Sequence, residues 1–107
     1  MESEGSIVIG DNNSITSDNV SAFGDSNIIK GNESNALGSN NTINGQNSTA
    51  IGKNNEVNKD SVAIGINNES RGENDYSVGK NNFSNGNNNH ISGDSNSIEG
   101  NNNYVFG

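Results

Sequence analysis

The 107-residue chain contains no cysteine, no proline and no tryptophan, and only 26 % of its residues are hydrophobic. Without cysteine there is no disulfide framework, no thiol nucleophile and no thiolate metal site. Without proline, no strand loses a backbone N–H group from its hydrogen-bond ladder, which suits a fold made of consecutive strands. These absences exclude cysteine chemistry and favour a β-rich chain.

Basic residues are also scarce. The five Lys and Arg residues are dispersed, and 13 acidic residues bring the formal net charge to −8. Because nucleic-acid-binding proteins present clustered basic groups to the phosphate backbone, we expect no nucleic-acid partner. No apolar run approaches the ~20 residues of a membrane-spanning helix, and the first residues, "MESEGS", are acidic, unlike a signal peptide. We therefore expect that this segment does not insert into a membrane by itself.

Asn, Ser and Gly make up more than half of the chain, a composition typical of disorder. The spacing of glycine indicates the opposite, because thirteen of the fourteen glycines lie on a seven-residue grid if one residue is missing between Gly52 and Gly65. A fixed short period is typical of a solenoid, in which each unit packs on its neighbours. In a helix, each of these glycines would cost about 1 kcal/mol relative to Ala. The pattern predicts one domain over residues 1–107, built of strands and tight turns, with a tightened turn near Lys59.

Two kinds of seven-residue unit alternate, so that the full repeat is a 14-residue coil of two strands, and about seven coils fit in the chain. The first kind carries two or three apolar residues, as in "GSIVIG" (5–10), "STAIG" (48–52) and "DSVAIG" (60–65). The second kind carries mostly one, at Ile15, Ile29, Ile43, Val57 and Ile98. The expected fold class is an all-β parallel solenoid.

Side chains along a strand alternate between its two faces. Because both kinds of unit have the same seven-residue spacing, the inward position of the second kind predicts the inward position of the first. In the first kind of unit the inward residues are Val8, Ala22, Ala36, Ala50, Ala63, Ser77, Ile91 and Val105. An outward apolar stripe then follows, comprising Ile9, Phe23, Leu37, Ile51, Ile64 and Val78. Soluble monomers rarely expose such a patch, so we expect copies of the chain to associate through the stripe. In the alternative, the large residues fill the coil and Lys30 and Arg71 lie inside.

Seven asparagines occur at one place on successive coils, each three residues after a glycine position. Stacked amides of this kind can hydrogen-bond from coil to coil, and Asn and Gly tolerate the positive φ of tight turns. We expect a structural ladder and no ligand-binding role for Asn13, Asn27, Asn41, Asn55, Asn68, Asn82 and Asn96.

Repeats such as "NSTAIGKNN" (47–55) and "DSVAIGINN" (60–68) resemble the head repeats of trimeric autotransporter adhesins, the YadA-like family. The resemblance covers nearly the whole chain and is strongest from 34 to 68. It implies a left-handed parallel β-roll, a homotrimer, a place on the bacterial outer membrane, and adhesion to collagen, other extracellular-matrix proteins or immunoglobulin-superfamily receptors. The neck, stalk and membrane anchor of that family are not found in the sequence, so we expect a head fragment.

The last coils depart from the family pattern. Serines replace the inward apolar residues at positions 70, 77 and 84, and Ser92 interrupts the stripe. Aromatic residues or histidine directly precede the inward residues Ser77, Ser84, Ile91 and Val105, at Tyr76, Phe83, His90 and Tyr104. Exposed aromatic residues make good binding anchors, so Tyr76, Phe83 and Tyr104 are candidate receptor contacts, with packing between coils or subunits as the alternative.

The sequence indicates no enzyme, no cofactor and no metal site. His90 is the only histidine, and a lone surface histidine without a nucleophile partner is typical of an incidental residue. An aspartate follows a coil glycine at three places, where Asp commonly forms turns: Asp11, Asp25 and Asp94. Weak cation binding is the alternative.

The expected function is that of an adhesive binding module. A structural spacer or fibre segment without its own ligand is the alternative, and an ice-binding solenoid is disfavoured because Thr16, Thr42 and Thr49 form no regular ladder.

Overall fold

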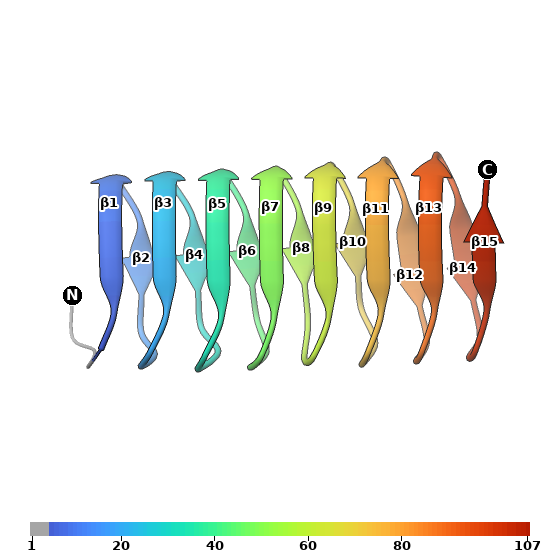
Figure 1. Cartoon of the computed structure of the whole chain (residues 1–107), viewed down its shortest axis with the longest axis horizontal. Helices are drawn as coiled ribbons and strands as arrows, with labels where there is room; N and C mark the ends of the chain where they lie inside the picture. The colour runs from blue at the N-terminus through green and yellow to red at the C-terminus, as the bar shows by residue number, and fades with distance from the viewer. Residues whose placement is uncertain (1–4) are drawn as a thin grey trace.

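A computed structural model describes residues 5–107, which form fifteen strands in two parallel sheets and no helix (Figure 1). The longer strands are β1 (Ile7–Asp11), β3 (Ser21–Asp25), β5 (Asn35–Ser39), β7 (Thr49–Lys53), β9 (Val62–Ile66), β11 (Tyr76–Lys80), β13 (His90–Asp94) and β15 (Tyr104–Phe106). The shorter strands are β2 (Ser14–Ile15), β4 (Ile28–Ile29), β6 (Thr42–Ile43), β8 (Glu56–Val57), β10 (Glu69–Ser70), β12 (Phe83–Asn85) and β14 (Ser97–Glu99).

The chain winds as a solenoid of about seven turns, with one odd-numbered and one even-numbered strand in each turn (Figure 1). The odd-numbered strands make an eight-stranded sheet in sequence order, and the even-numbered strands make a seven-stranded sheet behind it. Each strand pairs with the equivalent strand of the next coil, 14 residues away in all but the shortened coil, as Ile9 does with Phe23. The molecule measures 38 × 19 × 12 Å. The predicted all-β solenoid with a 14-residue period is therefore confirmed.

The space between the two sheets is thin and is filled by one small and one large side chain in most coils. Ala22, Ala36, Ala50 and Ala63 of the odd-numbered strands are fully buried. Opposite them, the even-numbered strands bury Ile15, Ile29, Ile43 and Val57. In later coils Ser70, Ser77 and Ser84 occupy the same buried positions. The structure thus places the alanine face inside, as the alternation of side chains predicted.

The turns repeat as regularly as the strands. A residue with φ between 54° and 63° occurs every seven positions, except for the six-residue step from Asn54 to Asp60 in the shortened coil. Most of these residues are Asn, as at Asn12, Asn19 and Asn40. These are left-handed conformations, which Asn tolerates better than most residues. The residue with positive φ directly precedes each predicted ladder asparagine, so the ladder asparagines themselves are not in this conformation.

Glycine is required near the end of the long strands β1 to β13, because successive coils approach closely there. Gly24 has a φ of 130°, and a Cβ atom on it would lie 1.9 Å from the carbonyl oxygen of Gly38 in the next coil. The same close approach recurs at the glycines of the neighbouring coils. The glycine grid therefore arises from backbone contact between coils as well as from backbone conformation.

The predicted asparagines stack along one edge of the solenoid. The side-chain oxygen of each accepts the backbone N–H of the equivalent Asn in the next coil, at 3.0–3.2 Å from Asn13 to Asn96. Each side-chain amide also donates to a glycine carbonyl of the next coil, at 2.8–3.1 Å. Asn27, Asn41, Asn55, Asn68 and Asn82 are buried. These side chains satisfy buried backbone groups that no strand pairs, which is a structural role.

A second ladder, which the sequence pattern did not reveal, follows the opposite edge. Its members are Ser34, Ser48, Ser61, Asp75, Asn89 and Asn103. From Ser48 to Asn103, each backbone N–H donates to the side-chain oxygen of the preceding member, at 2.9–3.3 Å. Because Ser, Asp and Asn all provide an oxygen acceptor, the ladder continues through three residue types and does not appear as a repeat of one residue.

The coil predicted to be short has 13 residues, and the missing residue lies in the turn at Asn58–Asp60. Val62 pairs with Thr49 and Glu69 with Glu56, 13 positions apart in both sheets. The turn keeps its contact with the preceding coil, since the backbone N–H of Asp60 donates to the carbonyl of Gln46 at 2.9 Å. The loss of one residue therefore changes only this turn, and the strands on either side stay in register.

Candidate binding surface

The two outer faces of the solenoid differ in polarity. The outer face of the seven-stranded sheet carries mostly polar residues, including the exposed Lys30, Asn44, Arg71 and Glu99. Because Lys30 and Arg71 are exposed, the alternative in which the alanines face outward is wrong.

The outer face of the eight-stranded sheet carries the apolar stripe, formed by Ile9, Phe23, Leu37, Ile51, Ile64 and Val78. Ile9 is 61 % exposed, Phe23, Leu37, Ile64 and Val78 are 37–41 % exposed, and Ile51 is half-buried. The strand register pairs each of these residues with the next one, so the stripe is continuous across six strands. It is a single apolar surface left open to solvent in the isolated chain.

Next to the stripe, an aromatic column crosses the last three odd-numbered strands. The rings of Tyr76 and His90 are stacked with centroids 4.8 Å apart and planes within 2°, and those of His90 and Tyr104 are stacked at 4.6 Å and 3°. These spacings equal the ~4.8 Å distance between neighbouring strands. The coil repeat alone therefore brings together three residues that are 14 positions apart in the sequence.

Phe83, the third candidate receptor contact, does not belong to this column. It lies on β12 of the opposite sheet, half-buried, and the Arg71 guanidinium carbon is 5.1 Å from its ring centroid. Arg71 also forms an ion pair with Glu69. The structure thus brings together Tyr76 and Tyr104 and separates them from Phe83, which serves as a platform for a neighbouring side chain.

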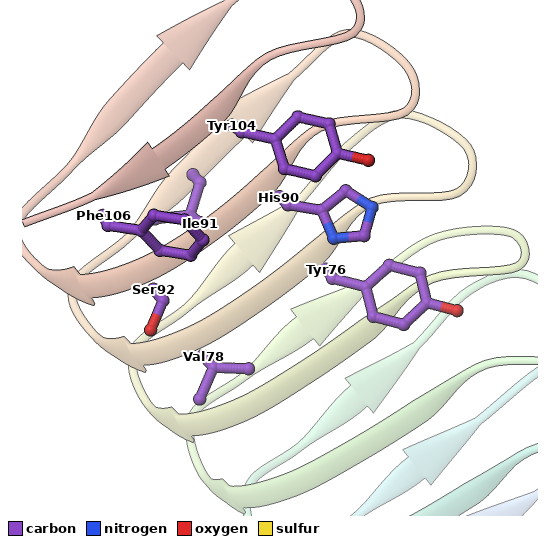
Figure 2. Close-up of a pocket in the computed structure, with 7 residues that line it drawn as sticks. All are labelled: Tyr76, Val78, His90, Ile91, Ser92, Tyr104 and Phe106. Carbon is purple, nitrogen blue, oxygen red and sulfur yellow. The ribbon is translucent and has the colours of Figure 1, made fainter.

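A groove of about 260 Å³ separates the aromatic column from the end of the stripe (Figure 2). Its lining residues are Tyr76, Val78, His90, Ile91, Ser92, Tyr104 and Phe106. Ser92 stands where other strands carry a large apolar residue, and its register neighbours are Val78 and Phe106. The groove therefore exists because a small side chain interrupts a row of large ones. The sequence showed this interruption, but His90, Ile91 and Phe106 were not identified as its neighbours.

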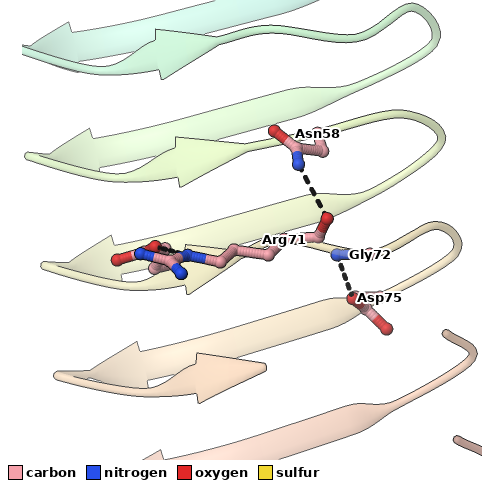
Figure 3. Close-up of polar contacts among 5 residues, drawn as sticks. Asn58, Arg71, Gly72 and Asp75 are labelled. Atoms are coloured by element: carbon pink, nitrogen blue, oxygen red, sulfur yellow. Dashed lines mark hydrogen bonds and ion pairs between the residues drawn. The ribbon is translucent and has the colours of Figure 1, made fainter. Parts of the chain in front are cut away.

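A buried polar cluster lies inside the same coils. Asp75 is buried, and its carboxylate accepts the backbone N–H of Asn89 at 2.9 Å. It also accepts the backbone N–H of Gly72 at 3.1 Å (Figure 3). Burial raises the pKa of the Asp75 carboxyl, and hydrogen bonds from the Asn89 and Gly72 backbones and from Ser84 oppose this shift. Ser70 and Ser77 share a hydrogen bond of 3.0 Å across the core. This cluster belongs to the second ladder and the core, away from the outer groove.

The turn before Asp75 is held by a further bond. The Asn58 side-chain amide donates to the Arg71 carbonyl at 2.7 Å, directly before Gly72 (Figure 3). This contact joins the shortened turn to the next coil. The polar residues of this region therefore serve to connect coils.

The acidic turn residues form local contacts. The hydroxyl groups of Ser26 and Ser95 donate to the carboxylates of Asp25 at 3.2 Å and Asp94 at 3.0 Å. Among residues 5–107, no group of three or more His, Asp or Glu side chains is placed to hold a metal ion. In the same range there is no helix that could span a membrane.

Comparison with known proteins adds no relative to this description. No protein-family model matches the chain, and no curated protein matches it significantly.

Proposed function

We propose that this chain is a head segment of a bacterial trimeric autotransporter adhesin, in which three copies associate through their apolar stripes and bind a host protein. The observation that carries the proposal is the stripe itself, which six successive odd-numbered strands expose on a solenoid whose other face is polar. The 14-residue parallel coils and the repeats "STAIG" and "DSVAIG" support the same assignment.

The physical argument for self-association is the size and continuity of the stripe. Strands ~4.8 Å apart place its first and last residues about 24 Å from each other. Apolar surfaces of this length on soluble proteins usually mark an interface. Identical copies close such an interface by rotation about one axis, which brings equivalent coils to the same level. The number of three copies and the left-handed winding come from the resemblance to the YadA-like heads.

Adhesion is the function that this architecture suits. Three identical outer surfaces per molecule, and many molecules per cell, multiply a modest affinity at each site into strong attachment. We propose that the chain acts at the bacterial cell surface, and that its partner is collagen, another extracellular-matrix protein or an immunoglobulin-superfamily receptor. The proposal includes no catalysis, no cofactor and no nucleic-acid partner, in keeping with the net charge of −8.

Two measurements test this proposal. Light scattering of the purified chain is expected to give about three times 11.1 kDa. Immobilised collagen, fibronectin and an immunoglobulin-superfamily receptor ectodomain are then tested for saturable binding by surface plasmon resonance, with heat-unfolded chain as the control. A folded monomer would contradict the proposed interface.

A structural spacer is a second candidate function. The observation that favours it is the regularity of the two hydrogen-bonded ladders, which make every coil nearly equivalent and suit an extended rod. A spacer would show the trimer mass but no saturable binding to any of the three host proteins. Saturable binding of the folded trimer would instead support adhesion.

A further inference from the structure

The proposed association of copies covers two rows of side chains, because residues two positions apart on a strand lie on the same face. The first row is the apolar stripe, and the strand register continues it through Ser92 on β13 and Phe106 on β15. The second row lies two residues earlier on each strand and comprises Ile7, Ser21, Asn35, Thr49, Val62, Tyr76, His90 and Tyr104. Both rows therefore face a neighbouring copy.

The two rows compensate each other in side-chain size. On three strands the first row carries a large apolar residue and the second row carries a shorter polar one. These pairs are Phe23 and Ser21 on β3, Leu37 and Asn35 on β5, and Ile51 and Thr49 on β7. On β13 the order is reversed, since Ser92 lies in the first row and His90 in the second. A large and a short side chain thus share each of these four levels of the solenoid.

Rotational symmetry determines which rows meet. Copies related by an axis parallel to the solenoid hold equivalent coils at the same level. If the axis faces the line between the two rows, the first row of each copy lies beside the second row of the next copy. Each large side chain of the four levels then meets a short one, which gives the close packing typical of interfaces. An axis facing the first row itself would instead bring copies of Ser92 together and leave a void between them.

The notch at Ser92 is not filled by the His90 side chain of the same chain. The imidazole stacks between Tyr76 and Tyr104, and its ring lies on the side away from Ser92 (Figure 2). The groove of about 260 Å³ over Ser92 is therefore open in one chain. A ring from the next copy, at the same level, has room to enter it.

Hydrogen bonding gives an independent argument. Within residues 5–107, the side chains of His90 and Ser92 form no hydrogen bond. Association removes water from both groups, and buried polar groups are almost always hydrogen-bonded. A neutral imidazole has one donor and one acceptor nitrogen, and a serine hydroxyl can both donate and accept. The two side chains can therefore satisfy each other across the boundary between copies.

We propose that His90 of each copy enters the notch over Ser92 of the next copy and forms a hydrogen bond with its hydroxyl group. The site is incomplete in one chain, because the ring and the notch come from different copies. This inference rests on the proposed association and adds which residues meet in it. The polar pair also fixes the register of the copies, since a shift by one coil would place His90 against Val78 or Phe106 and leave its nitrogens unpaired.

Cysteine cross-linking tests which residues meet, because the chain contains no cysteine of its own. Chains carrying only His90→Cys are refolded together with tagged chains carrying only Ser92→Cys, oxidised and separated by mass. The mixed cross-link is expected to exceed each of the two self-cross-links at least fivefold. A Thr49→Cys and Ile51→Cys mixture is expected to behave in the same way on β7. A His90→Cys and Val78→Cys mixture, one coil out of level, is expected to give at least fivefold less mixed product.

An exchange of side-chain sizes tests the notch itself. Ser92→Ile fills the notch with the residue that Ile51 and Ile64 provide at the equivalent register, so it is expected to weaken association at least tenfold in sedimentation experiments. His90→Ser combined with Ser92→Ile copies the order of sizes on β3 and β7 and is expected to restore association to within threefold of the wild-type chain. Because Ile occurs at this register in other coils, the circular dichroism spectra of both variants are expected to match the wild-type chain.

Two results would overturn the inference and leave the proposed association intact. Predominant self-cross-linking of the Ser92→Cys chain would mean that the first rows of different copies meet each other. Association of the Ser92→Ile chain as strong as that of the wild-type chain would mean that no ring enters the notch. A monomeric wild-type mass in light scattering, with no cross-link from the β7 or β13 mixtures, would instead reject the proposed association and this pairing with it.

Discussion

The buried asparagine ladder offers the most direct test of what holds the coils together, and Asn41→Ala is the perturbation. Asn41 is fully buried, and its side-chain oxygen accepts the backbone N–H of Asn55 at 3.2 Å. Its amide donates to the carbonyl groups of Leu37 and Gly52, at 3.1 Å in both cases. Alanine removes all of these side-chain bonds and leaves the buried N–H of Asn55 without its acceptor.

The expected cost follows from these bonds. A buried donor left unpaired costs about 1–3 kcal/mol, and each further lost hydrogen bond costs about 0.5–1.5 kcal/mol. For one unpaired donor and two lost bonds to backbone carbonyls, the sum is about 2–6 kcal/mol. The total stability of a domain of this size is about 5–15 kcal/mol, so the loss is a large fraction of it.

The assay is urea unfolding followed by circular dichroism, and Asn44→Ala is the matched control. Asn44 lies in the same coil but is exposed, and its position is not part of either ladder. The control is expected to stay within about 0.5 kcal/mol of the wild-type free energy of unfolding. If the two variants lose the same stability, the ladder contributes little and the coils are held by strand pairing and apolar burial alone.

The remaining predictions concern the stripe and the buried polar cluster. Replacing both Ile51 and Ile64 with Asp places charges in the proposed interface, so light scattering is expected to show dissociation, accompanied by unfolding. An unchanged mass would reject the interface. Because burial raises the pKa of Asp75, its contribution to stability is present at low pH and is lost as the pH rises through that raised pKa. Asp75→Asn is therefore expected to melt higher than the wild-type chain at pH 7, with a difference that shrinks toward acidic pH. A lower melting temperature at pH 7 would mean that the lost bond to the Gly72 N–H outweighs burial of the charge. Ser70→Val with Ser77→Ala copies the preceding coil and is expected to stabilise the chain by about 1 kcal/mol, since burial of the Val side chain exceeds the single hydrogen bond lost. Destabilisation in calorimetry would show that this polar core is required.

Several features followed from the sequence because they depend on local periodicity. The alternation of side chains along a strand placed Ala36 inside and Leu37 outside, and the structure agrees. The shortened coil was visible as a gap between Gly52 and Gly65, and the register of β7 and β9 shows the same gap. Side-chain orientation and coil length each depend on residues within one or two coils. The seven-residue spacing of the sequence therefore predicts both.

Other features could not be predicted in the same way. The second ladder includes Ser61, Asp75 and Asn89. These residues share only a side-chain oxygen that accepts a hydrogen bond, so no single residue type repeats along the sequence. Phe83 was grouped with Tyr76 as a candidate receptor contact, but it lies seven residues later and therefore on the opposite sheet. Residue type alone did not separate these two aromatics.

By itself, the sequence determined a strand solenoid, its 14-residue period and the residues that face into the core, because glycine spacing and side-chain alternation are properties of the local chain. The tertiary structure decided where surface groups meet. The stack of Tyr76, His90 and Tyr104 and the groove at Ser92 depend on the distance and register between strands 14 residues apart. That distance is set by backbone hydrogen bonds between coils, and only the folded chain forms them.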